Sequence, residues 1–347
     1  MNSMERVVMA LNHQEPDRVP VCPLLAGVSR NLIGANCREW STDAETCAKG
    51  LLKAREEFDL DCIVTLIDLS VECTAWGQEL VFPEHEAAHP NYKNQVIGDE
   101  DEYDKIQYVD FHTCDRMMMH IDVCKKLVEA SKGEFPVIAF VFGPLGTLSM
   151  LRNQEEMYVD CIEQPEVVHD TAGIITQVLQ EYCDALLDTG VQGIMFDTLF
   201  SSGSIMSKDM WDELEGEWVQ QLAEHVHARG AMVMIHNCGG KIYFDAQINR
   251  MHPEAISFLY PPDDCADFVE CKEKYGDVTT LIGCVAPTTV TVGTPEKVEA
   301  ECKANIDAMA KGGGFMLATG CELISPDAFD NARLMVDIAK TYGAYKK

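Results

Sequence analysis

The chain has 347 residues, of which 47% are hydrophobic and 24% charged, a composition typical of a globular protein with a large core. Its formal net charge of -30 argues against nucleic-acid binding, because phosphate recognition needs a basic surface stripe. No apolar run reaches the roughly 18 residues that a membrane helix needs, and residues 1–13 lack the apolar core and cleavage site of a signal peptide. The 15 cysteines form no short-spaced framework, which predicts reduced thiols in a cytoplasmic protein, as in an anaerobe.

The hydrophobic pattern predicts helices that alternate with short apolar strands. A first helix is expected at residues 3–12 and a second at 39–58, with Ser41 or Thr42 as the N-cap of the second. Further helices are expected at residues 117–131, 154–163, 165–189, 207–229, 241–250, 264–275, 295–311 and 326–343. Strands are expected at residues 19–25, 62–67, 135–142, 191–196, 231–235, 255–260, 279–284 and 315–319.

Nearly continuous apolar strands separated by helices indicate parallel pairing with both faces of the sheet covered. Eight such units in this length favour a single (β/α)8 TIM barrel, an α/β fold, over a doubly wound sheet. The prediction is therefore one TIM-barrel domain over residues 1–347, with an N-terminal helix in front of the barrel.

Residues 74–116, which follow the second expected strand, show no regular pattern and are rich in Pro, His, Asp, Glu and Tyr. The stretch is too long for an ordinary connection, which predicts an irregular insertion or an active-site lid. Its histidines His85, His89 and His112 are expected at the surface.

Catalytic groups of a TIM barrel lie just after the carboxyl ends of its strands. The residues at these positions are Cys22 to Gly27, Asp68 with Glu72, Gly143-Pro144, Asp197, His236 with Cys238, Tyr260, Cys284 and Cys321. A single cysteine after an apolar strand is usually a small buried hydrophobe, which is the interpretation for Cys22 and Cys284. Asp68 and Asp197 serve equally well as caps of the turns that follow them.

One stretch, His236-Asn237-Cys238-Gly239-Gly240, follows an expected strand, and Cys321 follows the last one. Because the strand ends of a parallel barrel converge, the imidazole of His236 and the thiolates of Cys238 and Cys321 are expected to hold a zinc ion. Three protein ligands with an open fourth position are typical of a catalytic zinc rather than a structural one. A carboxylate from Asp68, Glu72 or Asp197 is expected to fill the fourth position until substrate displaces it.

Two thiolate ligands favour chemistry at sulfur. A zinc ion held by two cysteines and one histidine can bind an exogenous thiolate and keep it ionised near neutral pH. Zinc sites that activate water more often use three histidines, or two histidines and a glutamate. The ligand set therefore predicts alkyl transfer to a thiol in preference to hydrolysis.

Four stretches carry a family resemblance: Glu5-Arg6-Val7, Asp17-Arg18-Val19-Pro20, Gly143-Pro144-Leu145-Gly146-Thr147-Leu148, and His236-x-Cys238 with Cys321. Through them the chain resembles the uroporphyrinogen decarboxylase superfamily, and within it the zinc-dependent corrinoid methyltransferases such as the methylcobalamin:coenzyme M methyltransferases. The resemblance covers nearly the whole chain and implies that the histidine and the two cysteines of the last stretch bind Zn²⁺.

The decarboxylase itself is a poorer match. Asp68 lies where the decarboxylase has its central aspartate, but Arg30 is the only basic residue of the segment 22–30, which is rich in arginine in the decarboxylase. Cys321 stands where the decarboxylase has a histidine. Decarboxylation is therefore disfavoured.

The resemblance implies methyl transfer between a corrinoid (cobalamin) and a small thiol bound to zinc, in anaerobic one-carbon metabolism. The chain contains no Asp-x-His-x-x-Gly cobalamin signature, so the corrinoid is expected on a separate partner protein. The docking rim is expected at residues 74–116 and at the turns after Gly143 and Asp197. Gly143 and Tyr260 are the expected cofactor-binding residues.

Asp68, Glu72 and Asp197 are the expected catalytic carboxylates. Three alternatives remain open. The methyl group could move the other way, from a methyl donor to the corrinoid protein, as in an O-demethylase component. The protein could instead be a lyase related to the decarboxylase, or a corrinoid-binding protein without catalytic activity.

Overall fold

The computed structural model describes residues 1–84 and 86–345, so the expectation for His85 lies outside the described residues. At its centre is a curled seven-stranded sheet in which all neighbouring strands are parallel and follow one another in chain order. The strands are β1 Ile63–Val64, β4 Val137–Phe142, β5 Gly193–Asp197, β6 Met232–Asn237, β7 Ala255–Phe258, β8 Thr280–Val285 and β9 Phe315–Thr319. The predicted α/β class with a parallel sheet is confirmed.

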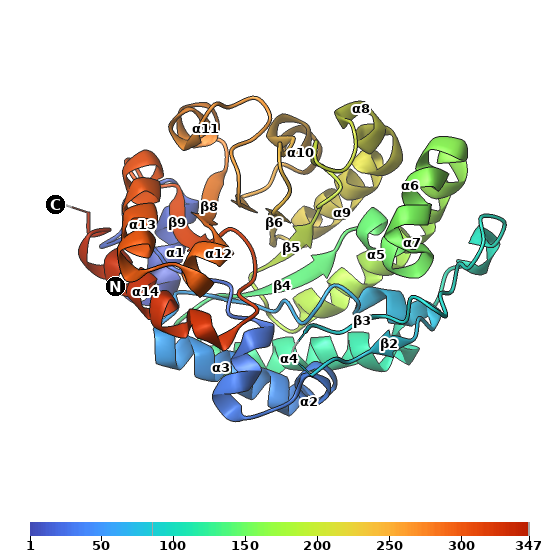
Figure 1. Cartoon of the computed structure of the whole chain (residues 1–347), viewed down its shortest axis with the longest axis horizontal. Helices are drawn as coiled ribbons and strands as arrows, with labels where there is room; N and C mark the ends of the chain where they lie inside the picture. Colours follow the sequence, from blue (N-terminus) through green and yellow to red (C-terminus); the bar gives the residue numbers. More distant parts are fainter. Residues whose placement is uncertain (85, 346–347) are drawn as a thin grey trace.

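Helices surround this sheet on its outer side (Figure 1). They are α1 Ser3–Leu11, α2 Cys37–Thr42, α3 Ala44–Phe58, α4 Asp115–Ser131, α5 Pro144–Arg152, α6 Gln154–Glu163, α7 Pro165–Asp188, α8 Lys208–Trp211, α9 Glu217–Ala228, α10 Phe244–Met251, α11 Phe268–Tyr275, α12 Pro287–Val292, α13 Pro295–Met309 and α14 Phe329–Thr341. A π-helical turn, Asp212–Gly216, joins α8 to α9. None of the helices in the described part of the chain is long and apolar enough to cross a bilayer.

The helix expected at residues 39–58 is divided into α2 and α3. Asp43 lies between them in an extended conformation, and its side chain accepts a hydrogen bond from Thr46 N at 2.8 Å. The predicted N-cap at Ser41 or Thr42 is therefore wrong, because the Asp43 carboxylate is the group that satisfies the first free N–H donors of α3.

The strand expected at residues 19–25 is not formed. Val21 makes a single parallel bridge to Leu317 of β9, with Cys22 N donating to Leu317 O at 2.9 Å. Pro20 and Pro23 have no N–H to donate, so a regular ladder cannot run through this segment. The predicted barrel of eight regular strands is thus reduced to seven strands and one irregular segment.

Asp61 connects this segment to the start of β1. Its backbone N–H donates to Val21 O at 3.0 Å, and its carboxylate accepts from Val21 N at 2.8 Å. The same carboxylate, fully buried, binds the guanidinium groups of Arg6 and Arg18 at 2.8 and 2.7 Å. The buried Asp61 carboxylate therefore connects the irregular segment to the sheet, a role that backbone pairing between strands has elsewhere in the sheet.

Residues 74–84 and 86–116 are mostly irregular. Within this stretch the structure has the short antiparallel pair β2 Leu80–Val81 and β3 His89–Pro90, and the single 3₁₀ turns Tyr103–Lys105 and Phe111–Thr113. The stretch is anchored by side chains that join the outer core between sheet and helices, namely Ile97, Tyr103, Ile106 and Phe111. Tyr103 also donates a hydrogen bond to Asp160 of α6 at 2.8 Å.

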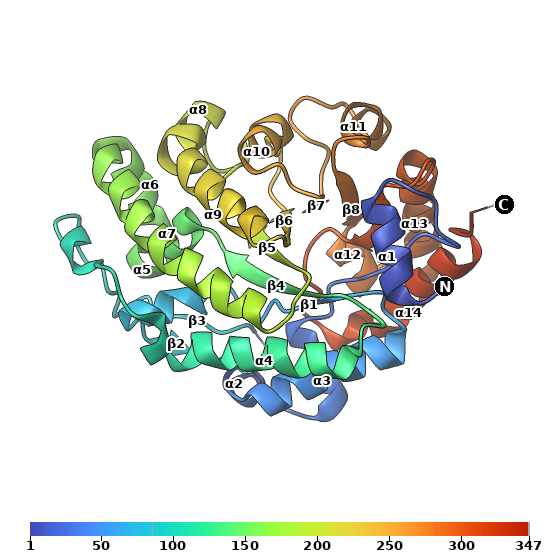
Figure 2. The same ribbon diagram turned by 180° about the vertical axis from the view of Figure 1, so that it is seen from behind.

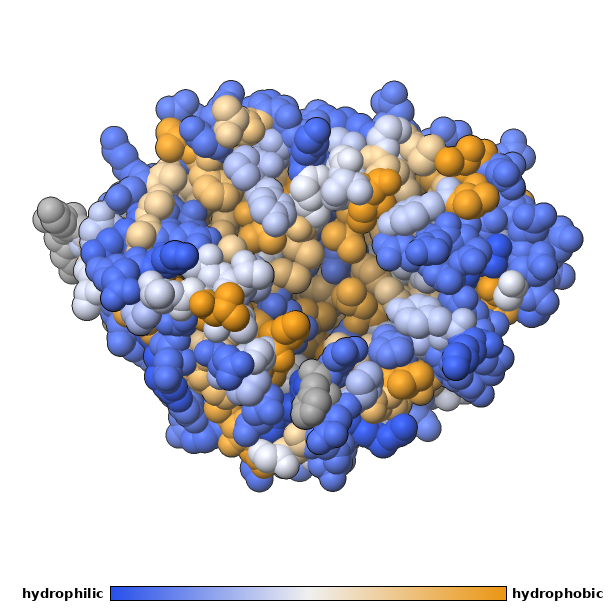
Figure 3. Space-filling view, viewed as in Figure 1, coloured by the Kyte–Doolittle hydropathy of each residue, from blue (hydrophilic) through white to orange (hydrophobic). Residues whose placement is uncertain are grey.

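Side chains that alternate along the strands separate the core into an outer and an inner part. The inner cluster lies on the concave side of the sheet and consists of Val7, Ala10, Cys22, Ala26, Cys62, Leu66, Ile138, Phe140, Met195, Met234, Ala255, Ile282, Met316 and Ala318. Val7 and Ala10 come from α1, which covers the amino ends of the strands (Figure 2). The opposite end, where the strands finish, is left open, and there Figure 3 shows a central hollow with largely apolar walls.

Candidate metal centre

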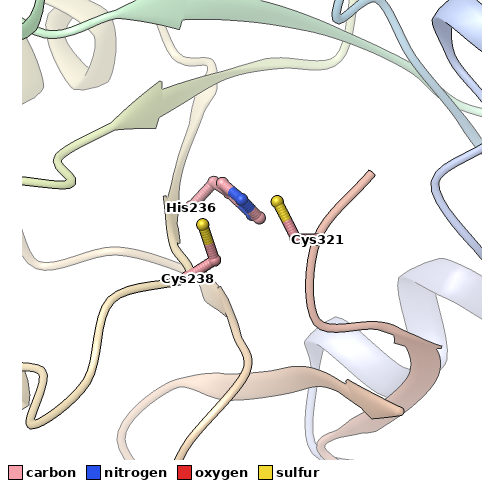
Figure 4. Close-up of side chains that lie close together, drawn as sticks. All are labelled: His236, Cys238 and Cys321. Carbon is pink, nitrogen blue, oxygen red and sulfur yellow. The ribbon is translucent and has the colours of Figure 1, made fainter. Parts of the chain in front are cut away.

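Three potential ligands converge at the open end of the sheet. His236 lies on β6, Cys238 follows one residue beyond that strand, and Cys321 follows two residues beyond β9. Their ligand atoms all lie within 4.8 Å of one another, and the side chains point toward a common centre (Figure 4). On a tetrahedral zinc ion such atoms are roughly 3.3 to 3.8 Å apart, so small side-chain adjustments bring all three onto one ion.

The sheet register fixes the direction of His236. Residues 234, 236 and 238 alternate with outward-facing ones, so the imidazole points inward. Its register neighbour on β7, Ser257, has its Oγ 3.0 Å from His236 Nδ1. This hydrogen bond leaves Nε2 for a metal ion, the arrangement by which a metal-binding histidine is usually held in place.

The two thiols share their protons unequally. The pKa of Cys321 falls to about 4, because the Cys238 thiol and His236 hydrogen-bond its thiolate. The pKa of Cys238 is raised by the neighbouring Cys321 thiolate and by burial. Burial alone would lower the pKa of His236, but Cys321 and Asp197 raise it above its ordinary value. The centre thus holds a thiolate and shared protons that a divalent cation would displace.

Two carboxyl groups lie close to this centre. Asp197, the register neighbour of His236 on β5, is buried, and burial raises its pKa to about 7. Glu322 directly follows Cys321, and burial raises its pKa to about 8. Thiolate, imidazole and nearby carboxylates form a donor set that fits a zinc ion.

The comparisons with known proteins agree with the fold. The family model described as uroporphyrinogen decarboxylase (URO-D) matches residues 2–342. The chain belongs to the uroporphyrinogen decarboxylase family. Among curated proteins, it is 24% identical to the methylcobamide:CoM methyltransferase MtaA of Methanosarcina barkeri, over 98% of each chain.

Two solved structures share the fold of this family member. A methyltransferase from Methanosarcina mazei has a TM-score of 0.83 at 22% identity, with 99% of each chain covered. A B12-independent methionine synthase from Shewanella sp. W3-18-1 has a TM-score of 0.54 at 14% identity, covering 95% of this chain and 94% of the other. The similarity to these structures shows a TIM-barrel-like fold.

Asp68 and Glu72, the other expected catalytic carboxylates, lie outside the trio of His236, Cys238 and Cys321 in this family member. Asp68 is buried and forms an ion pair with Arg116, whose Nη2 lies 2.7 Å from Asp68 Oδ2. Glu72 accepts a hydrogen bond from Phe142 N at 3.1 Å. Within the described residues, no carboxylate belongs to the group of mutually close ligand atoms at this centre.

Gly143 and Tyr260, the expected cofactor-binding residues, have different surroundings. Gly143 is buried at the start of α5, where its N–H donates to Asp197 O at 2.9 Å. A Cβ at this position would lie 2.8 Å from that oxygen, so only glycine fits. Tyr260 follows β7 and is 51% exposed.

Sequence reasoning did not identify Glu215. Its carboxylate accepts hydrogen bonds from Leu145 N and Trp211 Nε1 at 2.9 and 2.8 Å, and burial raises its pKa to about 7. Glu215 lies in the π-helical turn between α8 and α9, and its hydrogen bond from Leu145 N stabilises the start of α5, where Gly143 lies. No sequence signal marks it, since the helical pattern at residues 207–229 looks continuous.

The substitution Glu72→Gln is expected to make stability less dependent on pH. Burial raises the pKa of Glu72 to about 7, whereas an unfolded glutamate titrates near about 4.3. Between these values the folded chain keeps a proton that the unfolded chain releases, so this stabilising contribution is complete below about pH 4 and is lost as the pH rises through 7.

Urea unfolding at pH 5 and pH 8 measures this effect. The free energy of unfolding of the wild type should decrease from pH 5 to pH 8, and this decrease should be roughly 2 to 3 kcal/mol smaller in Glu72→Gln. The exposed Glu156→Gln is the matched control and should behave as the wild type does. Equal pH dependence in all three proteins would show that Glu72 does not retain its proton on folding.

Proposed function

We propose that this protein transfers a methyl group from a methylcobamide, carried by a separate corrinoid protein, to a small thiol. The observation that carries the proposal is the convergence of His236, Cys238 and Cys321 at the open end of the sheet. The similarity to a methylcobamide:CoM methyltransferase over 98% of both chains supports the same activity.

A zinc ion held by His236, Cys238 and Cys321 would supply a Lewis acid that binds the acceptor thiol and lowers its pKa. Ser257 holds the imidazole in the direction that this requires. Asp197 takes the proton that the acceptor thiol loses, because its pKa of about 7 matches a neutral operating pH. One of its oxygens, Oδ1, already accepts from Leu199 N at 3.0 Å, which leaves Oδ2 for this proton.

The acceptor thiolate then attacks the methyl group of the methylcobamide. A sulfur–carbon bond forms while the cobalt–carbon bond breaks, and both electrons of the broken bond remain on cobalt as Co(I). The apolar inner cluster below the site excludes water from this step.

The corrinoid protein would dock on the open end of the sheet. Exposed apolar side chains follow strand ends there, with Tyr260 after β7 and Ile324 after β9, which are 51% and 70% exposed. We assign Tyr260 and the irregular residues 74–84 and 86–116 to the rim that receives the corrinoid.

The proposed direction is tested by mixing the zinc-loaded protein with methylcobalamin and small thiols and following the corrinoid absorption spectrum. The expected result is conversion of methylcobalamin to Co(I) cobalamin together with one methyl thioether per corrinoid. If no thiol reacts, but Co(I) cobalamin is methylated by a methoxylated, methylthiol or halide compound, the direction of transfer is the reverse.

The substitution Ser257→Ala is expected to weaken zinc binding by roughly 10- to 100-fold, because a partner that orients a metal-binding histidine contributes about this much to affinity. Competition with a chromophoric zinc chelator measures the change. Ser204→Ala, another serine near β6 whose Oγ instead accepts from Gly240 N at 3.1 Å, is the control and should keep the wild-type affinity. Unchanged affinity in both variants would show that Ser257 does not position His236.

A further inference from the structure

A polar side chain lies in apolar surroundings between two of the proposed zinc ligands. Asn237 separates His236 from Cys238 in the sequence and is fully buried. Because His236 points to the inner side of the sheet, Asn237, the next residue of β6, points to the outer side. The outward positions before it are Val233 and Ile235, which belong to the apolar core between sheet and helices. An amide in this place is costly unless its polar atoms are hydrogen-bonded.

The Asn237 amide forms three hydrogen bonds, all with backbone groups. Its Nδ2 donates to Thr198 O and Ser201 O at 2.7 and 3.2 Å. Its Oδ1 accepts from Gly239 N at 2.9 Å. The two carbonyl groups belong to the loop after β5, and the N–H belongs to the residue after Cys238. Asn237 therefore connects the turn that carries Cys238 to the loop after β5.

The turn needs such support because strand pairing ends before it. Asn237 is the last residue of β6 with a partner on β7, which is Phe258, so Cys238 lies beyond the paired part of the strand. Gly239 and Gly240 follow, and glycine gives the backbone more conformational freedom than any other residue. An asparagine side chain that accepts from the N–H two residues further on closes a turn of this kind. The contact between Asn237 and Gly239 thus fixes the backbone on both sides of Cys238.

The loop after β5 is firmly attached to the end of β6. Thr198 directly follows Asp197, and Thr198 N donates to His236 O at 3.1 Å. A second backbone hydrogen bond, from Gly203 N to Lys241 O at 2.9 Å, joins later parts of the two loops. The loop therefore keeps a fixed place relative to the strand end, and a side chain bound to it is fixed as well.

We propose that Asn237 is a positioning residue that sets the place of the Cys238 sulfur relative to the Asp197 carboxyl group. The proposal rests on the proposed function and adds a requirement to it. The sulfur that binds zinc and the carboxyl group that takes the acceptor's proton are held in register by one buried amide. Asn237 acts only through the backbone of its neighbours, since its side chain points away from the inner side of the sheet.

The metal site itself gives the first test. In Asn237→Ala, zinc affinity measured by competition with a chromophoric chelator is expected to decrease roughly 10- to 100-fold, as for other residues that orient metal ligands. Cobalt(II) can replace zinc in such a site, and its thiolate charge-transfer absorption reports the cysteine ligands. This absorption per bound cobalt ion should be lower in Asn237→Ala, because Cys238 is no longer held in place.

Asn237→Ser is the conservative variant. A serine hydroxyl can accept from the N–H two residues further on, more weakly than an asparagine does, so this variant should recover part of the zinc affinity and of the cobalt absorption. It also decides the question if Asn237→Ala does not fold. Wild-type zinc affinity and cobalt absorption in the folded variants would overturn the role of Asn237.

Asn331→Ala is the matched control. Asn331 Nδ2 also donates to two backbone carbonyl groups, Val290 O and Gly293 O at 2.9 and 3.0 Å, and joins α14 to the end of α12. Its loss should lower the midpoint of urea unfolding and leave zinc affinity and cobalt absorption unchanged. A change of the cobalt absorption in Asn331→Ala as large as in Asn237→Ala would show a general effect of stability and overturn the proposal.

Kinetics at saturating zinc separate this inference from the proposed function. For methyl transfer from methylcobalamin to 2-mercaptoethanol, kcat of Asn237→Ala should decrease roughly 10- to 100-fold, and by a larger factor than KM changes, because the reacting groups are misplaced. Altered metal binding in Asn237→Ala without methylation of any thiol by the wild type would contradict the proposed reaction and leave the positioning of Cys238 supported. A wild-type kcat in Asn237→Ala would overturn the proposal, whatever the metal assays show.

Discussion

The substitution Cys321→Ala is expected to lower the zinc content from about one ion per chain to nearly none. Only His236 and Cys238 would remain as protein ligands, and two ligands do not hold a catalytic zinc against dilution and chelation. Methyl transfer from methylcobalamin to a thiol should fall by roughly 1,000-fold or more, since the acceptor thiol would no longer be ionised at this site. Elemental analysis and the methylcobalamin assay measure the two effects.

Cys265→Ser is the matched control. Cys265 is a free thiol with the same intermediate exposure as Cys321, but it lies outside the trio. Its substitution should leave both zinc content and methyl transfer unchanged. Full zinc content in Cys321→Ala would show that the zinc ion is held elsewhere.

The substitution Asp61→Ala is expected to lower the free energy of unfolding by roughly 3 to 5 kcal/mol, because it leaves buried cations without their partner. Arg18 would lose its ion pair, and Arg6 would keep only the one with Asp17. Val21 N would lose its acceptor as well, which leaves only the backbone hydrogen bond from residue 61 N to Val21 O between the irregular segment and the start of β1. Urea unfolding followed by circular dichroism measures the change.

Asp59→Asn serves as the control two residues away. The Asp59 side chain is 58% exposed and pairs with Lys340 at 2.8 Å. An exposed ion pair contributes less than about 1 kcal/mol, and asparagine tolerates the left-handed backbone of this position. Similar losses in Asp59→Asn and Asp61→Ala would contradict the role assigned to Asp61.

The sequence was sufficient to predict the parallel α/β sheet, most helices and the convergence of the trio. Strand periodicity places His236 and Cys238 on one face, and the ends of parallel strands meet at one edge, so Cys321 could be expected nearby. These inferences depend only on local pattern and topology.

Other features depend on contacts that no local pattern shows. The segment at residues 19–25 has the apolar composition of a strand, but Pro20 and Pro23 interrupt its hydrogen bonding and Asp61 replaces the pairing. The Glu215 carboxylate contacts Leu145 N, near Gly143, from a π-helical turn that the sequence pattern does not show.

The ligand set of the metal gives the most direct test of the central claim. X-ray absorption at the zinc edge of the purified protein, before and after addition of an acceptor thiol, counts the sulfur ligands at about 2.3 Å. The proposed site predicts one zinc ion with two sulfur ligands and one imidazole, and a third sulfur ligand once the thiol is present. A sulfur count that does not rise with any acceptor thiol would contradict thiol activation at His236, Cys238 and Cys321.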